Sequence, residues 1–368
     1  MRSLILSWEY PPLIEGGLAR HVRKLAEGLV LEGVDVHVLT RGLEEAPPEE
    51  DCEGVVIHRV REPERPRELG EFVTWIEHMN ADMLAAGVEL GDRYAFDVVH
   101  GHDWLVAVAG DHLAKRFRCP LLMTIHATEY GRHQGFVEKH PQSYIHGVER
   151  WMANRAERVI TCSAYMRDHV SDIYGLEEER ISVIQNGIDP SELEPVADLE
   201  SLRAEFAAPD ERLGSVRFIV AGSGTAEPEL RRQARELGLE AHGTFLGWIG
   251  DDVLHSLYRI SDLTVVPSIY EPFGLVALEA MASGCPCLVA DTGGLREVVP
   301  NEDVGLRFRS RDPRSLGAMA ERLLTDDELR DRLVAEASEH VLSFDWADVA
   351  REVADLYEAI VAAGARVP

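Results

Sequence analysis

The chain has 368 residues, of which 45% are hydrophobic, and its 65 acidic and 37 basic residues give a net charge of −28. This length predicts about two domains, each with enough apolar content for a core, which excludes a mainly disordered chain. A surface this acidic repels phosphate backbones and anionic lipid, which excludes nucleic-acid binding and polybasic attachment to membranes.

The basic residues are almost all arginine, because Lys24, Lys115 and Lys139 are the three lysines and the other 34 are arginines. A high-GC genome explains arginine in place of lysine, but it does not require a charge of −28. Few lysines and many carboxylates are typical of proteins that work in concentrated salt, where screening weakens the repulsion between like charges. We therefore expect a cytoplasmic protein of a high-salt organism.

Neither the cysteines nor the apolar segments indicate a secreted or membrane protein. The five cysteines are an odd number, and Cys285 and Cys287 have neither redox nor zinc-ribbon spacing, so we expect reduced core residues. The N-terminus lacks the pattern of a secretion signal. The longest weakly charged stretch, Phe273 to Ala290, contains Glu279 and Gly284 and predicts a buried helix and strand rather than a transmembrane segment.

Along the first half of the chain, short apolar runs alternate with segments of helical periodicity, which is typical of βα units and a parallel sheet. One expected helix is Ala19–Leu31, with Gly33 as its C-terminal stop. The acidic stretch Glu44–Glu53, with two prolines, predicts a solvated loop. The expected strands are Ser3–Ser7, Val34–Thr40, Val55–Val60, Asp97–His100, Leu121–His126, Arg158–Cys162 and Ile181–Gln185.

A second βα series follows a polar, Glu-rich passage that ends near Glu211. Its last helix, Trp346 to about Ala363, is expected to pack back on the first domain. The expected strands are Val216–Ala221, Thr244–Leu246, Leu263–Pro267, Cys287–Ala290 and Gly305–Phe308. The predicted domains are residues 1–187, residues 188–344 and the C-terminal helix in residues 345–368.

The sequence therefore predicts an α/β protein with two Rossmann-like, doubly wound domains that face each other across a cleft. In such sheets the carboxyl ends of the strands meet at the cleft, which is the usual place for a ligand. Glycines precede several expected helices, at Gly16-Gly17-Leu18, at Gly274 and at Gly293-Gly294-Leu295. Their bare backbone lets helix N-termini approach a phosphate closely, although a single Gly-Gly turn is also ordinary loop geometry.

Polar residues gather where two of the expected strands end, in His100-Gly101-His102-Asp103-Trp104 and in Thr124-Ile125-His126-Ala127-Thr128-Glu129-Tyr130. A zinc site is one reading, but the chain has no HExxH motif and no paired His/Cys spacing on a helix. Hydrogen bonding to a polyhydroxylated ligand suits this mixture of His, Asp, Glu and Tyr better. We therefore expect no metal.

The motif with the clearest chemistry is Glu-Pro-Phe-Gly-Leu-Val-Ala-Leu-Glu-Ala, which begins at Glu271. Glu271 lies in a loop and Glu279 about two turns into the next helix, so both side chains can face one ligand from different depths. The structural alternative is that Glu271 caps the helix and Glu279 is a surface residue. Glu279 stands among apolar residues, where an unpaired carboxylate is costly, which opposes that alternative.

In this order, these pieces resemble the retaining GT-B glycosyltransferases of family 4, and within them the glycogen-synthase-like branch. The resemblance covers nearly the whole chain. Its most specific part is the motif from Glu271 to Met281, with Gly293-Gly294-Leu295 downstream. Its other marks are Ser7-Trp8-Glu9-Tyr10-Pro11-Pro12, Gly16-Gly17-Leu18, His102-Asp103-Trp104, Thr124-Ile125-His126-Ala127-Thr128-Glu129 and Asn186-Gly187-Ile188-Asp189.

The resemblance implies that the cleft binds a nucleotide diphosphate sugar, UDP-glucose or ADP-glucose, as donor, with a glycan or small molecule as acceptor and no other cofactor. Backbone amides of Gly17 and Leu18 would bind the diphosphate, and those of Gly274 and Leu275 the sugar or phosphate. Retention in this family is usually described as front-face attack by the acceptor hydroxyl with the departing phosphate as base. The protein then mainly positions the substrates and stabilises charge.

The same resemblance assigns roles to side chains. His126 would lie beside the donor sugar, Glu271 would bind sugar hydroxyls, and Glu279 would hold the ribose hydroxyls. The expected catalytic side chains are His126, Glu271 and Asp103. Glu9 and Tyr130 are expected on the acceptor side, with less direct support from the motif.

One departure from the family lies at the start of the second domain. Family members usually carry there a strand ending in Gly-Arg and a Lys-Gly near the next helix, and this Arg and Lys neutralise the leaving diphosphate. Here Arg212-Leu213 leads directly to Gly214-Ser215-Val216, and no lysine follows Lys139. Losing this unit (~30 residues) would remove a central strand and leave a hole in the core. Either such a segment of the protein is missing from this chain, or the protein is a degenerate member.

The leading hypothesis is a retaining enzyme that transfers a hexose, with glucose as the expected sugar, to a glycan hydroxyl. The alternative is a catalytically inactive sugar-nucleotide or polysaccharide binding protein of the same fold. The missing Arg and Lys favour this alternative, whereas Glu271, Glu279 and His126 oppose it. A non-hydrolysing epimerase of the same shape is a third hypothesis, which the spacing of the two glutamates disfavours.

Overall fold

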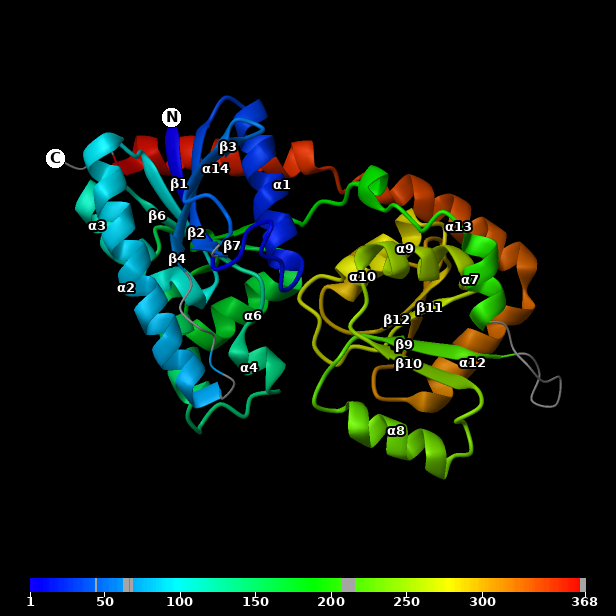
Figure 1. Ribbon diagram of the computed structural model, residues 1–368. Helices are drawn as coiled ribbons and strands as arrows, with labels where there is room; N and C mark the ends of the chain where they lie inside the picture. Colours follow the sequence, from blue (N-terminus) through cyan, green and yellow to red (C-terminus); the bar gives the residue numbers. More distant parts are fainter. Residues whose placement is uncertain (44, 62–65, 67–68, 207–215, 365–368) are drawn as a thin grey trace.

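The computed structural model describes residues 1–43, 45–61, 66, 69–206 and 216–364. The chain forms two α/β units that lie side by side, and its last helix runs back from the second unit to the first (Figure 1). The expectation of an α/β fold with two parallel-sheet units is therefore confirmed.

In the described residues, the first unit has one eight-stranded sheet in the order β3-β4-β2-β1-β5-β6-β7-β8. All neighbouring strands are parallel except β3 and β4. The strand order reverses at β1, which pairs with β2 and β5, and ligands of such sheets bind beyond the strand ends at this point. The strands are β1 (Arg2–Leu6), β2 (Asp35–Gly42), β3 (Glu49–Cys52), β4 (Val55–Arg61), β5 (Val98–His102), β6 (Leu121–Ile125), β7 (Arg158–Thr161) and β8 (Ile181–Val183).

Strand β3 contradicts the expected solvated loop over Glu44–Glu53. Its residues pair antiparallel with β4, with Cys52 opposite Val55. β3 is an edge strand whose side chains are mostly exposed, so its acidic groups stay in solvent while its backbone pairs. The charge pattern showed the solvation but not the backbone pairing.

Helices cover both faces of the first sheet, and each face has its own apolar core. On one face α14 packs against α1, where a Cβ added to Gly28 would lie 2.6 Å from Ala350 Cβ. The hydroxyl of Tyr357 on α14 lies 2.8 Å from His100 Nδ1 under the sheet centre. None of the described helices combines the length and low polarity needed to cross a bilayer. The helices are α1 (Gly17–Leu31), α2 (Leu69–Arg93), α3 (Ala107–Phe117), α4 (Glu129–Arg132), α5 (Gln142–Arg155), α6 (Ala164–Tyr174) and α14 (Trp346–Gly364).

The second unit has two small parallel sheets, β10-β9 and β11-β12-β13. Its strands are β9 (Phe218–Ala221), β10 (Gly243–Gly247), β11 (Thr264–Val266), β12 (Cys287–Ala290) and β13 (Leu306–Phe308). Its helices are α7 (Leu199–Phe206), α8 (Glu227–Glu236), α9 (Asp251–Ile260), α10 (Leu275–Ala282), α11 (Leu295–Val298), α12 (Pro313–Thr325) and α13 (Asp327–Val341).

This split falls where the sequence predicted a missing central strand. Within the described residues, β9 pairs with β10 alone and β11 with β12 alone, so each has one edge without a partner strand. β9 and β10 contain no fully buried residue, whereas every residue of β12 is buried. One strand between β9 and β11 would join the two sheets into a doubly wound sheet of the usual order. The residues at this junction, 207–215, lie outside the described part, as does Arg212.

Candidate active site

The N-termini of α1 and α10 meet at the boundary between the two units. α1 begins at Gly17 and α10 at Leu275, and a Cβ added to Gly17 would lie 3.6 Å from Leu275 Cδ1. The N-cap residues Gly16 and Gly274 have no side chain to cap these helices, so amides of both first turns are available to an anion. The structure therefore brings together the four residues predicted to bind phosphate through their amides, Gly17, Leu18, Gly274 and Leu275.

Glycine is required in the loop before α10. Gly274 has a φ of +124°, which residues with side chains rarely adopt, and a Cβ there would lie 2.8 Å from Leu295 Cδ2. The amide of Gly294 donates to the backbone oxygen of Glu271 (2.9 Å). The Gly-Gly turn before α11 thus supports the loop that carries Glu271.

Glu271 and Glu279 lie on either side of the α10 N-terminus, and each keeps one oxygen engaged. Ser268 Oγ donates to Glu271 Oε2 (3.0 Å), and the Tyr258 hydroxyl donates to Glu279 Oε2 (3.0 Å). Burial raises the pKa of both carboxyls, and these hydrogen bonds oppose the shift. A backbone hydrogen bond from Phe273 also opposes the shift at Glu271.

Asp103 and His126 connect the ends of β5 and β6. The backbone N–H of His126 donates to Asp103 Oδ1 (2.8 Å), and Asp103 has a φ of +59°. Burial raises the pKa of Asp103 to about 6. Asp103 therefore fixes the loop that carries His126, instead of standing free in the cleft.

His126 is a neutral ring. Burial lowers its pKa to about 4, and nearby Arg132 acts in the same direction. Its Nε2 lies 3.0 Å from His102 Nδ1. A neutral imidazole can exchange a hydrogen bond with a hydroxyl without adding charge to the site.

The two predicted acceptor-side residues differ in exposure. Glu9 is 2% exposed and its Oε2 accepts from the amides of Glu15 (2.5 Å) and Gly16 (3.2 Å), so it holds the loop before α1. Burial raises the pKa of Glu9. Tyr130 is 37% exposed at the start of α4. Only Tyr130 presents a large surface to solvent.

Comparisons with known proteins agree with this geometry. The sequence profile of Glycosyltransferase Family 4 matches residues 15–192, and that of Glycosyl transferases group 1 matches residues 191–340. Glycogen synthase of Mycobacterium tuberculosis (strain H37Rv) is 37% identical, over 97% of this chain and 94% of its own length. The chain belongs to glycosyltransferase family 4. An uncharacterized glycosyltransferase of Methanocaldococcus jannaschii is 33% identical, over 97% of this chain and 98% of its own length.

Solved structures confirm the GT-B fold of this glycosyltransferase. Sucrose-phosphate synthase from Thermosynechococcus elongatus matches with a TM-score of 0.82 at 24% identity, over 98% of this chain and 99% of that one. The catalytic domain of starch synthase IV from Arabidopsis thaliana, bound to ADP and acarbose, matches with a TM-score of 0.72 at 18% identity, over 98% of this chain and 99% of that one.

The alignment to the mycobacterial glycogen synthase bears on the split sheet. It spans 390 positions, whereas 97% of 368 residues is about 357, so about 33 positions of the alignment have no residue in this chain. One βα unit with its connections has ~30 residues. The length difference and the unpaired edges of β9 and β11 therefore agree with a missing unit.

Several residues that the sequence did not single out connect the two units at the site. Arg20 on α1 forms an ion pair with Asp251 on α9, and its charge partly opposes the burial that raises the pKa of Glu279. It is a cation in the first turn of α1 that also acts on Glu279. Its position three residues after Gly17, on the same helix turn, was the available signal.

Glu297 and Tyr270 join the units on the other side. Glu297 on α11 accepts from the amides of Ala164 (Oε2, 3.0 Å) and Tyr165 (Oε1, 2.9 Å), so it caps α6 of the other unit. The amide of Thr128 donates to the Tyr270 hydroxyl (3.0 Å). Such contacts link residues more than 130 positions apart, and nothing in local sequence marks them.

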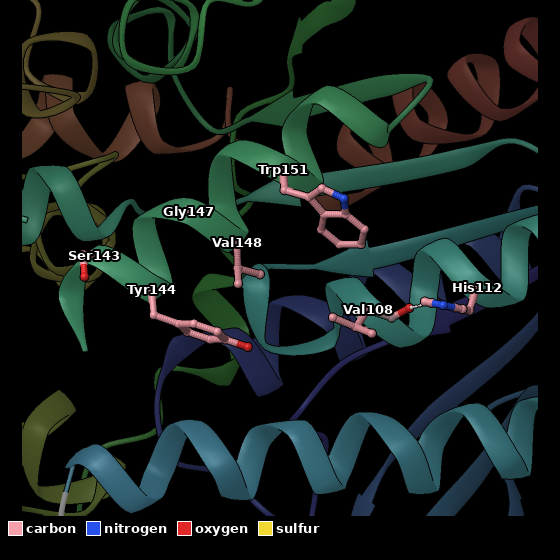
Figure 2. Close-up of a pocket in the computed structure, with 7 residues that line it drawn as sticks. All are labelled: Val108, His112, Ser143, Tyr144, Gly147, Val148 and Trp151. Atoms are coloured by element: carbon pink, nitrogen blue, oxygen red, sulfur yellow. Dashed lines mark hydrogen bonds between the residues drawn. The ribbon is translucent and has the colours of Figure 1, made fainter. Parts of the chain in front are cut away.

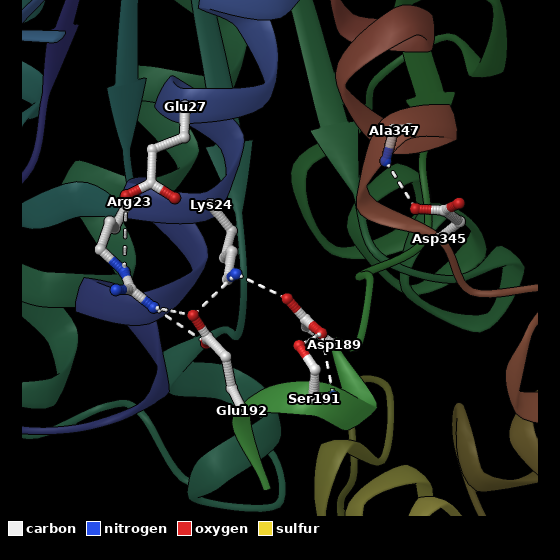
Figure 3. A network of polar contacts seen from close by, with 8 residues as sticks. All are labelled: Arg23, Lys24, Glu27, Asp189, Ser191, Glu192, Asp345 and Ala347. Atoms are coloured by element: carbon white, nitrogen blue, oxygen red, sulfur yellow. Dashed lines mark hydrogen bonds and ion pairs between the residues drawn. The ribbon is translucent and has the colours of Figure 1, made fainter. Parts of the chain in front are cut away.

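The connection between the units is also tied to α1. Lys24 Nζ lies 2.8 Å from Asp189 Oδ2 and 2.7 Å from Glu192 Oε1, and Arg23 also contacts Glu192 (Figure 3). One of the three lysines therefore binds the segment after β8. It is not placed as a phosphate ligand.

A shallow apolar pocket of about 390 Å³ lies on the outer face of the first unit, between α3 and α5 (Figure 2). Tyr144 and Trp151 on α5 face Val108 and His112 on α3 across it. None of its lining residues belongs to the predicted site, so we do not assign the active site to it.

Proposed function

We propose that this glycosyltransferase moves glucose from a nucleotide diphosphate glucose to a glycan hydroxyl, with retention of the anomeric configuration. The observation that carries the proposal is the meeting of two helix N-termini, α1 and α10, beside Glu271 and Glu279. Two sets of free amides favour a ligand with two phosphate groups. Structural neighbours support this ligand class, since Anabaena HepE was solved with UDP-glucose.

In this proposal the side chains position the donor on both sides of its diphosphate. Glu279 accepts from the ribose hydroxyls, and Glu271 from hydroxyls of the sugar. His126, held neutral by burial, exchanges a hydrogen bond with the sugar. Asp103 acts through His126, because it fixes the backbone of that residue.

The leaving diphosphate needs positive charge as well as amides. Arg20 is a candidate, because it reaches the side of Glu279 from the first turn of α1. A single arginine that is paired with Asp251 supplies less positive charge to the diphosphate than the Arg and Lys pair of the family. The split second sheet therefore favours, as a second candidate function, a sugar-nucleotide binding protein that does not catalyse transfer.

We also propose that the protein works in the cytoplasm of a high-salt organism. The net charge of −28 and the three lysines support this. Screening in concentrated salt weakens the repulsion that this charge produces.

The two functions are distinguished by incubating the protein in high KCl with glycogen and UDP-glucose, ADP-glucose or GDP-mannose. Transfer releases nucleoside diphosphate, whereas a binding protein retains the donor intact. A gene sequence that encodes a Gly-Arg…Lys-Gly unit between codons 205 and 220 would remove the main support of the binding-protein alternative. If none of the three donors leads to release of nucleoside diphosphate, the proposal that the protein is an enzyme is contradicted.

A further inference from the structure

Three histidines from separate elements meet beside the predicted site. His21 lies on α1, His102 at the end of β5 and His126 in the loop after β6. Each offers one ring nitrogen, and these three nitrogens lie within 4.8 Å of one another. The ring centroids of His21 and His126 are 4.5 Å apart, and those of His102 and His126 are 5.4 Å apart. Three histidines are also the protein ligands of the known His₃ class of metal sites.

Two ring nitrogens of this cluster lack the partners that buried polar groups usually have. His21 is 8% exposed and His102 is fully buried. Among the described residues, neither His21 Nδ1 nor His102 Nε2 has a hydrogen-bond partner. Most buried polar side-chain atoms are hydrogen-bonded, so these two nitrogens can take a ligand in addition to the existing contact between His102 Nδ1 and His126 Nε2 (3.0 Å).

The residues around His21 and His102 resemble those that hold the ligands of metal sites in place. Asn186 hydrogen-bonds to the side chain of His21, and such partners orient a ligating ring. On the other sides, the ring centroids of Trp346 and His21 are 5.2 Å apart, and those of His100 and His102 are 4.4 Å apart. These flat neighbours restrict how far the rings can turn.

The donor set selects the class of metal. Imidazole nitrogens suit Zn²⁺, Co²⁺, Ni²⁺ and Cu²⁺, whereas Mg²⁺ and Ca²⁺ prefer oxygen ligands. In a tetrahedral site with Zn–N bonds of 2.0–2.1 Å, two ligand nitrogens are about 3.3 Å apart. The three histidine nitrogens lie within 4.8 Å of one another, so they must move closer together when the metal binds. Three ligands leave one position of the tetrahedron open.

We propose that His21, His102 and His126 form a site for a zinc-like divalent transition metal, and that the bound metal competes with the donor sugar for His126. The sequence favoured no metal because its ligands come from three elements, and spacing rules detect ligands that lie close in the chain. The competition rests on the proposed role of His126, whereas the metal binding does not.

Metal binding is tested with Co²⁺, whose visible absorption reports nitrogen coordination, and with Zn²⁺ by calorimetry, both in high KCl without substrate. We expect saturable binding of one equivalent that EDTA reverses. His21→Phe keeps a flat ring in the same contacts, and His126→Asn changes a partly exposed loop residue. Each variant is expected to weaken binding about tenfold or more, since even partners of ligands contribute 10- to 100-fold.

Two further variants show whether the metal is held elsewhere. His112 is exposed on α3, so His112→Asn is expected to bind Co²⁺ like the wild type. His37 and His58 form another buried pair, with His37 Nδ1 and His58 Nε2 2.9 Å apart. Loss of binding in His58→Asn with wild-type binding in both His21→Phe and His126→Asn would overturn the proposal. So would the absence of a cobalt spectrum in the wild-type protein.

Competition is measured separately, as nucleotide release at several Zn²⁺ and donor concentrations. We expect Zn²⁺ to raise the KM for the donor and leave kcat unchanged. An unchanged KM at saturating metal would overturn the competition. If no donor supports any release, the proposed function fails, but the cobalt spectrum still decides on the metal site.

Discussion

The replacement Glu279→Gln tests the proposed nucleotide pocket most closely. Glu279 Oε2 is engaged by the Tyr258 hydroxyl at 3.0 Å, and a ribose would hydrogen-bond to the remaining acceptor positions. Exchanging a charged for a neutral acceptor costs about 1–1.5 kcal/mol per hydrogen bond. Two ribose hydroxyls then account for about 2–3 kcal/mol, which is an increase in Kd of about 30- to 140-fold.

The assay is calorimetric titration of UDP, ADP and their glucose derivatives. We expect Glu279→Gln to weaken binding of the free nucleotide and of the sugar nucleotide by the same factor. Glu271→Gln is the matched control, since it should weaken binding of the sugar nucleotide alone. Because burial raises the pKa of Glu279, the neutral variant should also remain folded. Wild-type affinity of Glu279→Gln for the free nucleotide, within about twofold, would refute the assignment.

Three further predictions concern stability. Glu297→Ala removes the acceptor of two amides at the N-terminus of α6, while the cap by Ser163 remains, and should lower the unfolding free energy by about 0.5–2 kcal/mol, visible as a lower urea midpoint; an unchanged midpoint would contradict this role of Glu297. Gly28→Ala should destabilise by about 1–3 kcal/mol, because the new methyl meets Ala350; a higher melting temperature would contradict this packing of α1 on α14. Burial raises the pKa of Glu149 to about 8, so the folded state binds its proton more tightly than the unfolded state. Its contribution to stability is therefore full below pH ~4.5 and lost as the pH rises through 8. Between pH 5.5 and 8 the unfolding free energy of the wild type should fall, relative to that of Glu149→Gln, by at most about 1.4 kcal/mol per pH unit. A difference in unfolding free energy that does not change with pH would contradict the raised pKa of Glu149.

The strands and the glycine turns could be predicted from the sequence because their causes are local. Apolar runs between helical segments marked the parallel strands, and the motif around Gly274 marked the start of α10. The same reasoning missed β3, because its acidic side chains gave the pattern of a loop while only its backbone pairs. The absence of the family's Gly-Arg and Lys-Gly unit near Arg212 predicted a hole in the second sheet. The described strands of the second unit accordingly form two separate sheets.

The contacts between the units could not be predicted in this way. His21 on α1 meets His102 at the end of β5 and His126 after β6, although His21 lies about 80 and 105 positions before them in the chain. Glu297 and Tyr270 act on α6 and α4 of the other unit, and their partners lie more than 130 positions away in the chain. A single sequence carries information on what a residue can do, but little on which distant residue it will meet.

The central claim is tested most directly by measuring transfer itself. The protein is incubated in high KCl with UDP-glucose or ADP-glucose and glycogen, and nucleoside diphosphate release is followed together with the anomeric signal of the new linkage. The account predicts release that depends on the acceptor and a product with the anomeric configuration of the donor. Tight binding of the nucleotide sugar with no release, for either donor, would contradict it and leave a binding protein of the same fold.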